Sequence, residues 1–261
     1  MGQGVRTVLE ALLLDLDGTL LDIDFQAFLR DYLARLGRHF ASRYPPDRFC
    51  GWVMASTRAM IDDRDPARTN RDAFWQDFAP RAGCPVEELL PGFEAFYREV
   101  FPRLCVYGRA VPAARPLVER ALARGLKVAV ATNPVFPLMA IQERLRWAGL
   151  ADLPFALVTA YEDMHFCKPH PEYYLETASR LGVEPRRCLM VGDRPWDDMS
   201  AALAGMRTYL VEREARGEAW GAGGGAGEHG SGAEAAGEEG PERLPVPDHR
   251  GPLEGVLGLV G

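Results

Sequence analysis

A short run of leucines that ends in two aspartates restricts the fold of this chain more than any other feature of its sequence. The run is Leu12-Leu13-Leu14-Asp15-Leu16-Asp17-Gly18-Thr19-Leu20. Continuous apolar stretches of this kind are typical of parallel strands whose two faces are both covered. The polar residues that follow would lie in a loop at the carboxyl end of the strand, where open parallel sheets bind their ligands. The run therefore predicts a buried strand that delivers two carboxylates to a functional edge.

Strand-like and helix-like patterns alternate in the second half of the chain. Short apolar runs predict strands, and apolar residues at helical spacing predict helices between them. The predicted strands are Lys127–Thr132, Phe155–Thr159, Cys188–Asp193 and Thr208–Val211. Each predicted helix is followed by a glycine, which suits a helix C-terminus, and these helices are Ala113–Arg124, Leu138–Ala148, Pro171–Leu181 and Asp198–Ala204. This alternation predicts an α/β fold with a parallel, Rossmann-like sheet that has helices on both faces.

The segment between the first strand and this alternating region has a different character. From Phe25 to about Leu104, apolar residues recur at helical spacing, and prolines interrupt the pattern at intervals. No strand-like run occurs within the segment, and about four helices are expected. Residues 21–105 are therefore predicted to form an all-helical insert in a core that is made of residues 1–20 and 106–212.

The last part of the chain contains a low-complexity stretch, Gly217–Gly240. Ten of its 24 residues are glycine and all five of its charged residues are acidic, so it cannot repay the entropy of ordering. Residues 213–243 are therefore expected to be disordered. Apolar residues return after this stretch, and residues 244–261 are expected to pack back on the core.

Composition and charge argue against several classes of partner. The net charge of −7 disfavours a nucleic-acid partner. No apolar run approaches the ~18 residues that span a bilayer, and the N-terminus has no apolar segment of a signal peptide. Five widely spaced cysteines without a CxxC pair argue against a disulfide scaffold or structural zinc. We therefore expect a cytoplasmic protein without a membrane partner, and the sequence gives no signal for its oligomeric state.

Four polar sites follow, or lie near, the carboxyl ends of the predicted strands. They contain Asp15 and Asp17, then Thr132 and Asn133, then Lys168, and finally Asp193 with Asp197 and Asp198. Carboxylates that are brought together repel unless a cation lies among them, and all-oxygen ligands suit Mg²⁺ better than zinc. A lysine and a threonine hydroxyl beside a metal suit a phosphoryl dianion, and a carboxylate can attack phosphorus.

This ordered set of motifs resembles the haloacid dehalogenase-like hydrolase superfamily, most of whose members are phosphatases. Asp15-Leu16-Asp17-Gly18-Thr19 matches the first motif of that family in full. The second, third and fourth motifs are matched in order by Thr132-Asn133, by Lys168-Pro169, and by Gly192-Asp193 with Asp197 or Asp198. The resemblance covers about residues 8–212, and the helical insert corresponds to the cap domain of the family.

The resemblance implies a role for each of these residues. Asp15 would be the nucleophile that forms an aspartyl-phosphate, and Asp17 would be the general acid for the leaving alcohol and then the base for water. Phosphate oxygens would be held by Thr132, Asn133 and Lys168. The cofactor would be Mg²⁺, bound by Asp15, by the backbone carbonyl of Asp17, by Asp193 and by Asp197 or Asp198. The distance in sequence to Gly205 favours Asp197 over Asp198.

The implied function is Mg²⁺-dependent hydrolysis of a small phosphorylated metabolite. Dehalogenation is disfavoured because a halide leaves without a proton, so that chemistry has no use for Asp17. Residues 20–110 contain no lysine, which argues against the phosphonate hydrolases that form a Schiff base in the cap. A sugar phosphomutase of the same superfamily remains an alternative because it shares the four motifs.

Two alternatives come from a different functional class. A phosphorylatable signalling receiver also combines Asp, Thr, Lys and Mg²⁺, but receivers are about half as long and lack both the paired aspartates and the helical insert. A catalytically silent relative that acts as a binding protein usually lacks the nucleophile or a metal ligand, and this chain retains every one of them.

Overall fold

A six-stranded parallel sheet forms the centre of the molecule. The computed structural model describes residues 8–212 and 245–260, and its sheet has the strand order β5-β4-β1-β6-β7-β8. Every neighbouring pair in this sheet is parallel. The strands are β1 (Ala11–Leu14), β4 (Lys127–Val130), β5 (Leu157–Val158), β6 (Cys188–Gly192), β7 (Arg207–Val211) and β8 (His249–Gly251). The prediction of an α/β fold with a parallel sheet is confirmed.

The central strand β1 is buried on both faces. Leu12 and Leu14 belong to one hydrophobic cluster, and Ala11 and Leu13 belong to the cluster on the opposite face. Successive side chains of a strand point to opposite faces, so a strand covered on both sides needs an apolar residue at every position. This requirement explains the continuous leucine run in the sequence.

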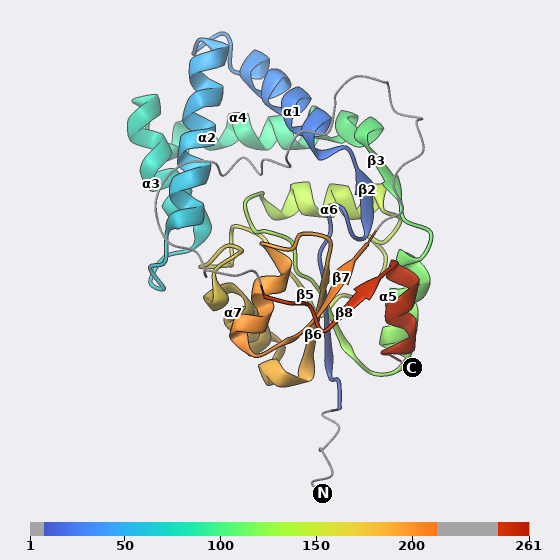
Figure 1. The fold of residues 1–261 in the computed structure, drawn as a ribbon. Helices are drawn as coiled ribbons and strands as arrows, with labels where there is room; N and C mark the ends of the chain where they lie inside the picture. The colour runs from blue at the N-terminus through green and yellow to red at the C-terminus, as the bar shows by residue number, and fades with distance from the viewer. Residues whose placement is uncertain (1–7, 213–244, 261) are drawn as a thin grey trace, which may run out of the picture.

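Helices cover both faces of the sheet (Figure 1). The helices α5 (Ala114–Ala123) and α6 (Leu138–Trp147) place their apolar residues in the cluster that contains Leu12 and Leu14. On the opposite face, α7 (Pro171–Leu181) joins the cluster that contains Leu13, together with the 3₁₀ helix η3 (Asp198–Ala204). A short 3₁₀ helix, η2 (Pro185–Arg187), precedes β6.

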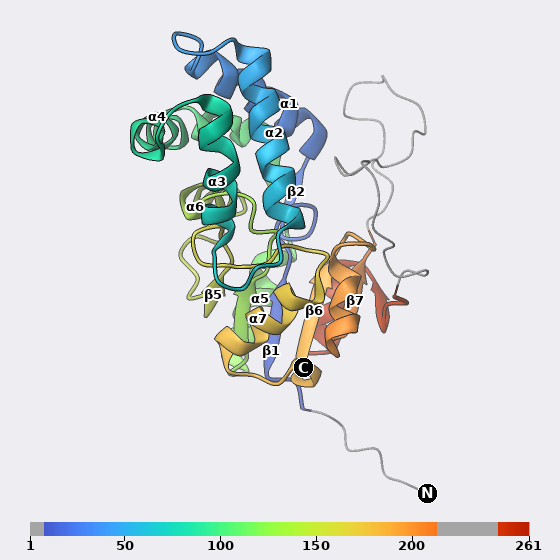
Figure 2. The same cartoon turned by 90° about the vertical axis from the view of Figure 1, so that its left-hand side faces the viewer.

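Four helices and a 3₁₀ helix form a separate layer beyond one end of the sheet, as both views show (Figures 1 and 2). They are α1 (Phe25–His39), α2 (Pro46–Asp62), α3 (Asn70–Ala82), α4 (Val86–Glu99) and η1 (Phe101–Tyr107). Aromatic side chains fill the centre of this helical layer, among them Phe28, Phe49, Phe78, Phe93 and Phe96, which are all buried. The backbone N–H groups of Asn70 and Arg71 donate to the carbonyls of Met164 and Tyr161, in the loop between β5 and α7.

A two-stranded antiparallel ribbon lies where the chain enters and leaves the helical layer. Its strands are β2 (Leu21–Ile23) and β3 (Gly108–Ala110). The sequence patterns do not predict either strand, because three residues are too few to show an alternation of period two. Within the part of the chain that the structure describes, no helix is long and apolar enough to cross a membrane.

The C-terminal segment adds the last strand to the sheet. β8 pairs with β7, and the 3₁₀ helix η4 (Leu253–Gly258) packs against α5. Leu253, Val256 and Val260 are buried in the same cluster as α5. The low-complexity stretch Gly217–Gly240, for which the sequence predicts disorder, lies outside the described residues.

The packing of η4 leads to a prediction about stability. The Leu253 side chain is only 4% exposed, so Leu253→Ala should leave a cavity and lower the free energy of unfolding by about 2–4 kcal/mol. Val246 is 84% exposed in the same segment, and Val246→Ala should change it by less than about 0.5 kcal/mol. Urea denaturation of both variants checks this, and equal effects would contradict the packing.

Candidate active site

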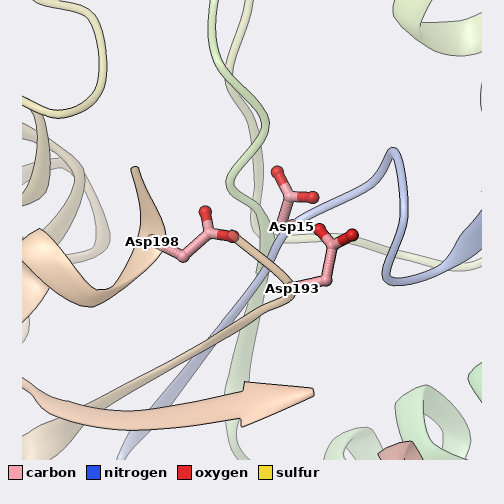
Figure 3. Close-up of side chains that lie close together, drawn as sticks. All are labelled: Asp15, Asp193 and Asp198. Carbon is pink, nitrogen blue, oxygen red and sulfur yellow. The ribbon is translucent and has the colours of Figure 1, made fainter. Parts of the chain in front are cut away.

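Three carboxylates from two strand ends and one helix meet at the carboxyl edge of the sheet. Asp15 follows β1, Asp193 follows the neighbouring β6, and Asp198 begins η3. Each offers a carboxylate oxygen, and these oxygens lie within 4.8 Å of one another. The close-up shows the three carboxylates turned towards the same region (Figure 3). We call Asp15, Asp193 and Asp198 the acidic cluster.

Lys168 is a buried cation at the centre of this site. Its ammonium donates to Oδ1 of Asp15 at 2.9 Å and to Oδ1 of Asp198 at 2.5 Å, while its side chain is only 2% exposed. Burial acts against the charged form, but the neighbouring carboxylates of Asp15 and Asp198 raise the pKa of Lys168 well above its usual range. Lys168 therefore stays charged and bridges two members of the acidic cluster.

The acidic cluster carries more negative charge than Lys168 can balance. Burial raises the pKa of Asp198 above that of an ordinary aspartate, although the ammonium of Lys168 opposes this effect. Three carboxylates still outnumber the ammonium of Lys168 and the nearby guanidinium of Arg194, and hard oxygen ligands are those that Mg²⁺ prefers. The residues present thus fit a bound Mg²⁺, which Asp15, Asp193 and Asp198 would hold.

Two glycines allow the acidic cluster to be this compact. Gly18 has a φ of +95°, and a Cβ atom there would lie 2.1 Å from Oδ2 of Asp193. A Cβ atom on Gly192 would lie 2.1 Å from Oδ2 of Asp198. Real Cβ atoms do not approach an oxygen so closely, so both positions require the absence of a side chain.

The second motif lies beside Lys168. Oδ1 of Asn133 accepts a hydrogen bond of 3.1 Å from the backbone N–H of Lys168. The carbonyl of Thr132 accepts hydrogen bonds from the hydroxyls of Thr159 at 2.7 Å and Tyr173 at 2.9 Å. Buried polar partners therefore fix the loop after β4 next to the acidic cluster.

The structure places the two adjacent aspartates, Asp197 and Asp198, in different surroundings. The carboxylate of Asp197 stands outside the acidic cluster, 3.9 Å from Nη1 of Arg194. Asp198 instead accepts from Lys168 and, at 2.9 Å through Oδ2, from the backbone N–H of Arg194. The turn from β6 into η3 therefore directs the second of the two adjacent aspartates inward, which spacing to Gly205 does not reveal. The role of Asp198 in binding metal stays a prediction.

Comparison with known proteins identifies the family of the chain. The profile of the haloacid dehalogenase-like hydrolases matches residues 9–205, which is most of the chain. The chain belongs to the haloacid dehalogenase-like hydrolases. Membership makes it a hydrolase, and the four sequence motifs quoted above lie within the matched residues.

Relatives that match this hydrolase over most of their length are named as phosphatases. It is 32% identical to Phosphatase MT3486 of Mycobacterium tuberculosis, over 78% of this chain and 88% of the relative. It is 28% identical to a phosphoglycolate phosphatase of Aquifex aeolicus, over 78% of this chain and 84% of the relative.

Solved structures show the same fold. A haloacid dehalogenase-like phosphatase of Thermococcus onnurineus superposes with a TM-score of 0.56, at 20% identity, over 97% of this chain and 98% of the other. A dehalogenase superposes with a TM-score of 0.52, also at 20% identity, over 96% of both chains. At this identity the likeness concerns the fold alone.

Asp17 stands apart from the acidic cluster in this hydrolase. Its carboxylate forms an ion pair with the guanidinium of Arg144, on helix α6. Burial raises the pKa of Asp17, and the positive charge of Arg144 opposes this effect. Its side chain is therefore directed towards α6 rather than towards the other aspartates.

Arg144 is a residue of this site that the sequence analysis misses. Its side chain is only 1% exposed, and its guanidinium carbon lies 4.6 Å from the centre of the Phe136 ring. A signal for it exists, because Ala140, Ile141 and Leu145 form the buried stripe of α6 and Arg144 falls within that stripe. A charged residue at an apolar position of an amphipathic helix indicates a buried partner.

The short distance between Gly18 and the carboxylate of Asp193 predicts that a side chain at Gly18 lowers activity as well as stability. Gly18→Ala should lower turnover of p-nitrophenyl phosphate by about 10²-fold, because the new Cβ displaces the carboxylate of Asp193. Gly125 also has a positive φ, of +75°, but a Cβ there would meet no atom within 4 Å. Both alanine variants should lose about 1–2 kcal/mol of stability from backbone strain, and only Gly18→Ala should lose activity. Full activity of Gly18→Ala would contradict this geometry.

The position of Asp198 predicts a difference between the two adjacent aspartates. Asp198→Asn removes a negative charge from the acidic cluster and should weaken Mg²⁺ binding by at least about tenfold. Asp197→Asn changes a side chain outside the cluster and should leave Mg²⁺ affinity within a few-fold of the wild type. Titration calorimetry with Mg²⁺ measures both, and a larger effect of Asp197→Asn would reverse the assignment.

Proposed function

We propose that this hydrolase is a Mg²⁺-dependent phosphatase that cleaves a small phosphate monoester through an aspartyl-phosphate on Asp15. One observation carries the proposal: at the sheet edge, the carboxylate of Asp15 accepts a hydrogen bond from the ammonium of Lys168 and has an oxygen within 4.8 Å of two further carboxylates. A nucleophile, a cation for phosphoryl oxygens and an oxygen-ligand site for a metal are thereby brought together. The names of the relatives support phosphate esters as the substrates.

The first step transfers the phosphoryl group to Asp15. The hydrogen bond from Lys168 holds Oδ1 of Asp15, so Oδ2 attacks phosphorus and the bond to the ester oxygen breaks. The ammonium of Lys168 and the amide of Asn133 bind the phosphoryl oxygens, where negative charge gathers in the transition state. Thr132 also lies on this loop and would hold a phosphate oxygen through its hydroxyl. Bound Mg²⁺ would neutralise further charge on the phosphoryl group.

Asp17 is the proton donor and acceptor of the proposed reaction. The leaving alkoxide needs a proton, and a buried carboxyl with a raised pKa carries one closer to neutral pH than an exposed aspartate does. Once Asp17 has given up its proton, its carboxylate can activate the water that cleaves the aspartyl-phosphate. The ion pair with Arg144 stabilises that ionised form.

Two isosteric variants test the different roles of Asp15 and Asp17. With p-nitrophenyl phosphate, whose leaving group needs little protonation, Asp17→Asn should show a burst of nitrophenolate and accumulate a phosphorylated enzyme that is stable in acid and labile in alkali. Steady-state turnover should fall by about 10²–10⁴-fold because the base for water is lost. Asp15→Asn has no attacking carboxylate, so it should show neither a burst nor a label.

The outcomes of this experiment are separable. Rapid-quench kinetics measures the burst, and peptide mapping locates the phosphate. Equal labelling of both variants, or a label on a serine or histidine, would show that Asp15 is not the nucleophile. Release of inorganic phosphate by the wild type distinguishes hydrolysis from transfer to a second hydroxyl, which is the reaction of a phosphomutase.

A further inference from the structure

Arg194 is a partly exposed cation beside the acidic cluster, and the proposed mechanism does not use it. It follows Asp193 directly, and its backbone N–H donates to Oδ2 of Asp198 at 2.9 Å, so the cluster itself fixes the backbone of this residue. Among the described residues, its guanidinium donates no hydrogen bond and forms an ion pair of 3.9 Å with Asp197. Its side chain is 40% exposed, so its N–H groups are open to a molecule that enters from solvent.

Arg194 lies between the first motif and the helical layer. Its guanidinium carbon is 5.3 Å from the centre of the ring of Phe25, the first residue of α1, at a distance where a cation is attracted to a ring. Burial acts against its charged form, but the carboxylates of Asp197 and Asp15 raise the pKa of Arg194. Burial raises the pKa of Asp17, and Arg194 is one of the cations that oppose this rise. The guanidinium is therefore close to both aspartates of the first motif.

The charges around Asp15 leave a task for such a cation. The three carboxylates of the acidic cluster would be balanced by the ammonium of Lys168 and a bound Mg²⁺. A phosphoryl dianion would then meet a site without net positive charge, although negative charge gathers on its oxygens in the transition state. Arg144 is engaged by the carboxylate of Asp17. Within the described part of the chain, Arg194 is left as the guanidinium of the site that can meet the dianion.

We propose that Arg194 is a further residue that binds the transferring phosphoryl group, with its planar guanidinium against the phosphoryl oxygens. The inference rests on the proposed function, because it takes Asp15 as the nucleophile that receives this group. A guanidinium presents several N–H donors in one plane, which suits two oxygens of a phosphoryl group. The contact with Phe25 would keep the guanidinium in place.

Inorganic phosphate is the probe for this role. Titration calorimetry at saturating Mg²⁺ should show that Arg194→Met weakens phosphate binding by roughly 10- to 100-fold, as expected for the loss of charged hydrogen bonds. Arg194→Lys keeps the charge but not the planar donors, so it should retain part of the affinity. In both variants kcat/KM for p-nitrophenyl phosphate should fall together with the phosphate affinity.

The affinity for Mg²⁺, measured without phosphate, separates this role from two others. Arg194→Met removes a positive charge close to the acidic cluster, so it should bind Mg²⁺ at least as tightly as the wild type. If Arg194 only held the turn after β6, the variant would bind both Mg²⁺ and phosphate more weakly, which would overturn the proposal. If Arg194 only balanced the charge of the empty cluster, phosphate binding would not change, which would overturn it as well.

Arg187, at the opposite end of β6, provides the control. It immediately precedes the strand, its side chain is 37% exposed, and it pairs with Glu10 at 2.5 Å. Arg187→Met should leave the affinities for phosphate and Mg²⁺ and the basal turnover unchanged. If Arg194→Met does not fold, Arg194→Lys decides, because a phosphate affinity equal to that of the wild type overturns the proposal.

The failure of this inference is distinct from the failure of the proposed function. A wild type that hydrolyses p-nitrophenyl phosphate with Mg²⁺, and whose phosphate affinity does not depend on Arg194, overturns the role of Arg194 only. A wild type that neither hydrolyses this ester nor binds inorganic phosphate overturns the proposed function itself.

Discussion

The buried ion cluster around Lys168 is the constraint on which the rest of this structure depends. The chain has only two lysines among its 30 basic side chains, and one of them is Lys168. A compact ammonium can donate in several directions, so it reaches both Asp15 and Asp198, whereas the planar fork of an arginine suits a single carboxylate. The burial of all three charged groups is tolerable only because they are held together.

The sheet sets the spacing of this cluster. β1 lies between β4 and β6, and the backbone N–H of Asp15 donates to the carbonyl of Val191 at 2.9 Å, so the ladder continues into the motif itself. Neighbouring strands are about 4.8 Å apart, which places side chains at adjacent strand ends within reach of one cation. The carboxylate geometry is thus a consequence of strand order, and Gly18 and Gly192 remove the side chains that would block it.

The sequence predicts those elements of the fold that need one particular kind of residue at each position. A strand that is covered on both faces must be apolar throughout, so the sequence predicts β1. The residue that ends a helix often adopts a left-handed backbone conformation, which favours glycine, so Gly182 predicts the end of α7. The pairing of β2 with β3 and of β8 with β7 depends on neighbours that are distant in sequence, so the sequence patterns do not predict β2, β3 or β8. Which of Asp197 and Asp198 joins the acidic cluster depends on the path of one turn, and spacing in the sequence does not specify that path. Arg144 shows the opposite case, because its position in the apolar stripe of α6 carries a signal that a search for family motifs does not use.

The helical layer is attached to the core next to the loops that carry the second and third motifs. Asn70, at the start of α3, is buried and donates from Nδ2 to the carbonyls of Pro134 at 3.4 Å and Phe166 at 3.3 Å. Those carbonyls lie one residue after Asn133 and two residues before Lys168, which are the proposed phosphate ligands. Any shift of α3 would therefore strain the loops that carry the second and third motifs.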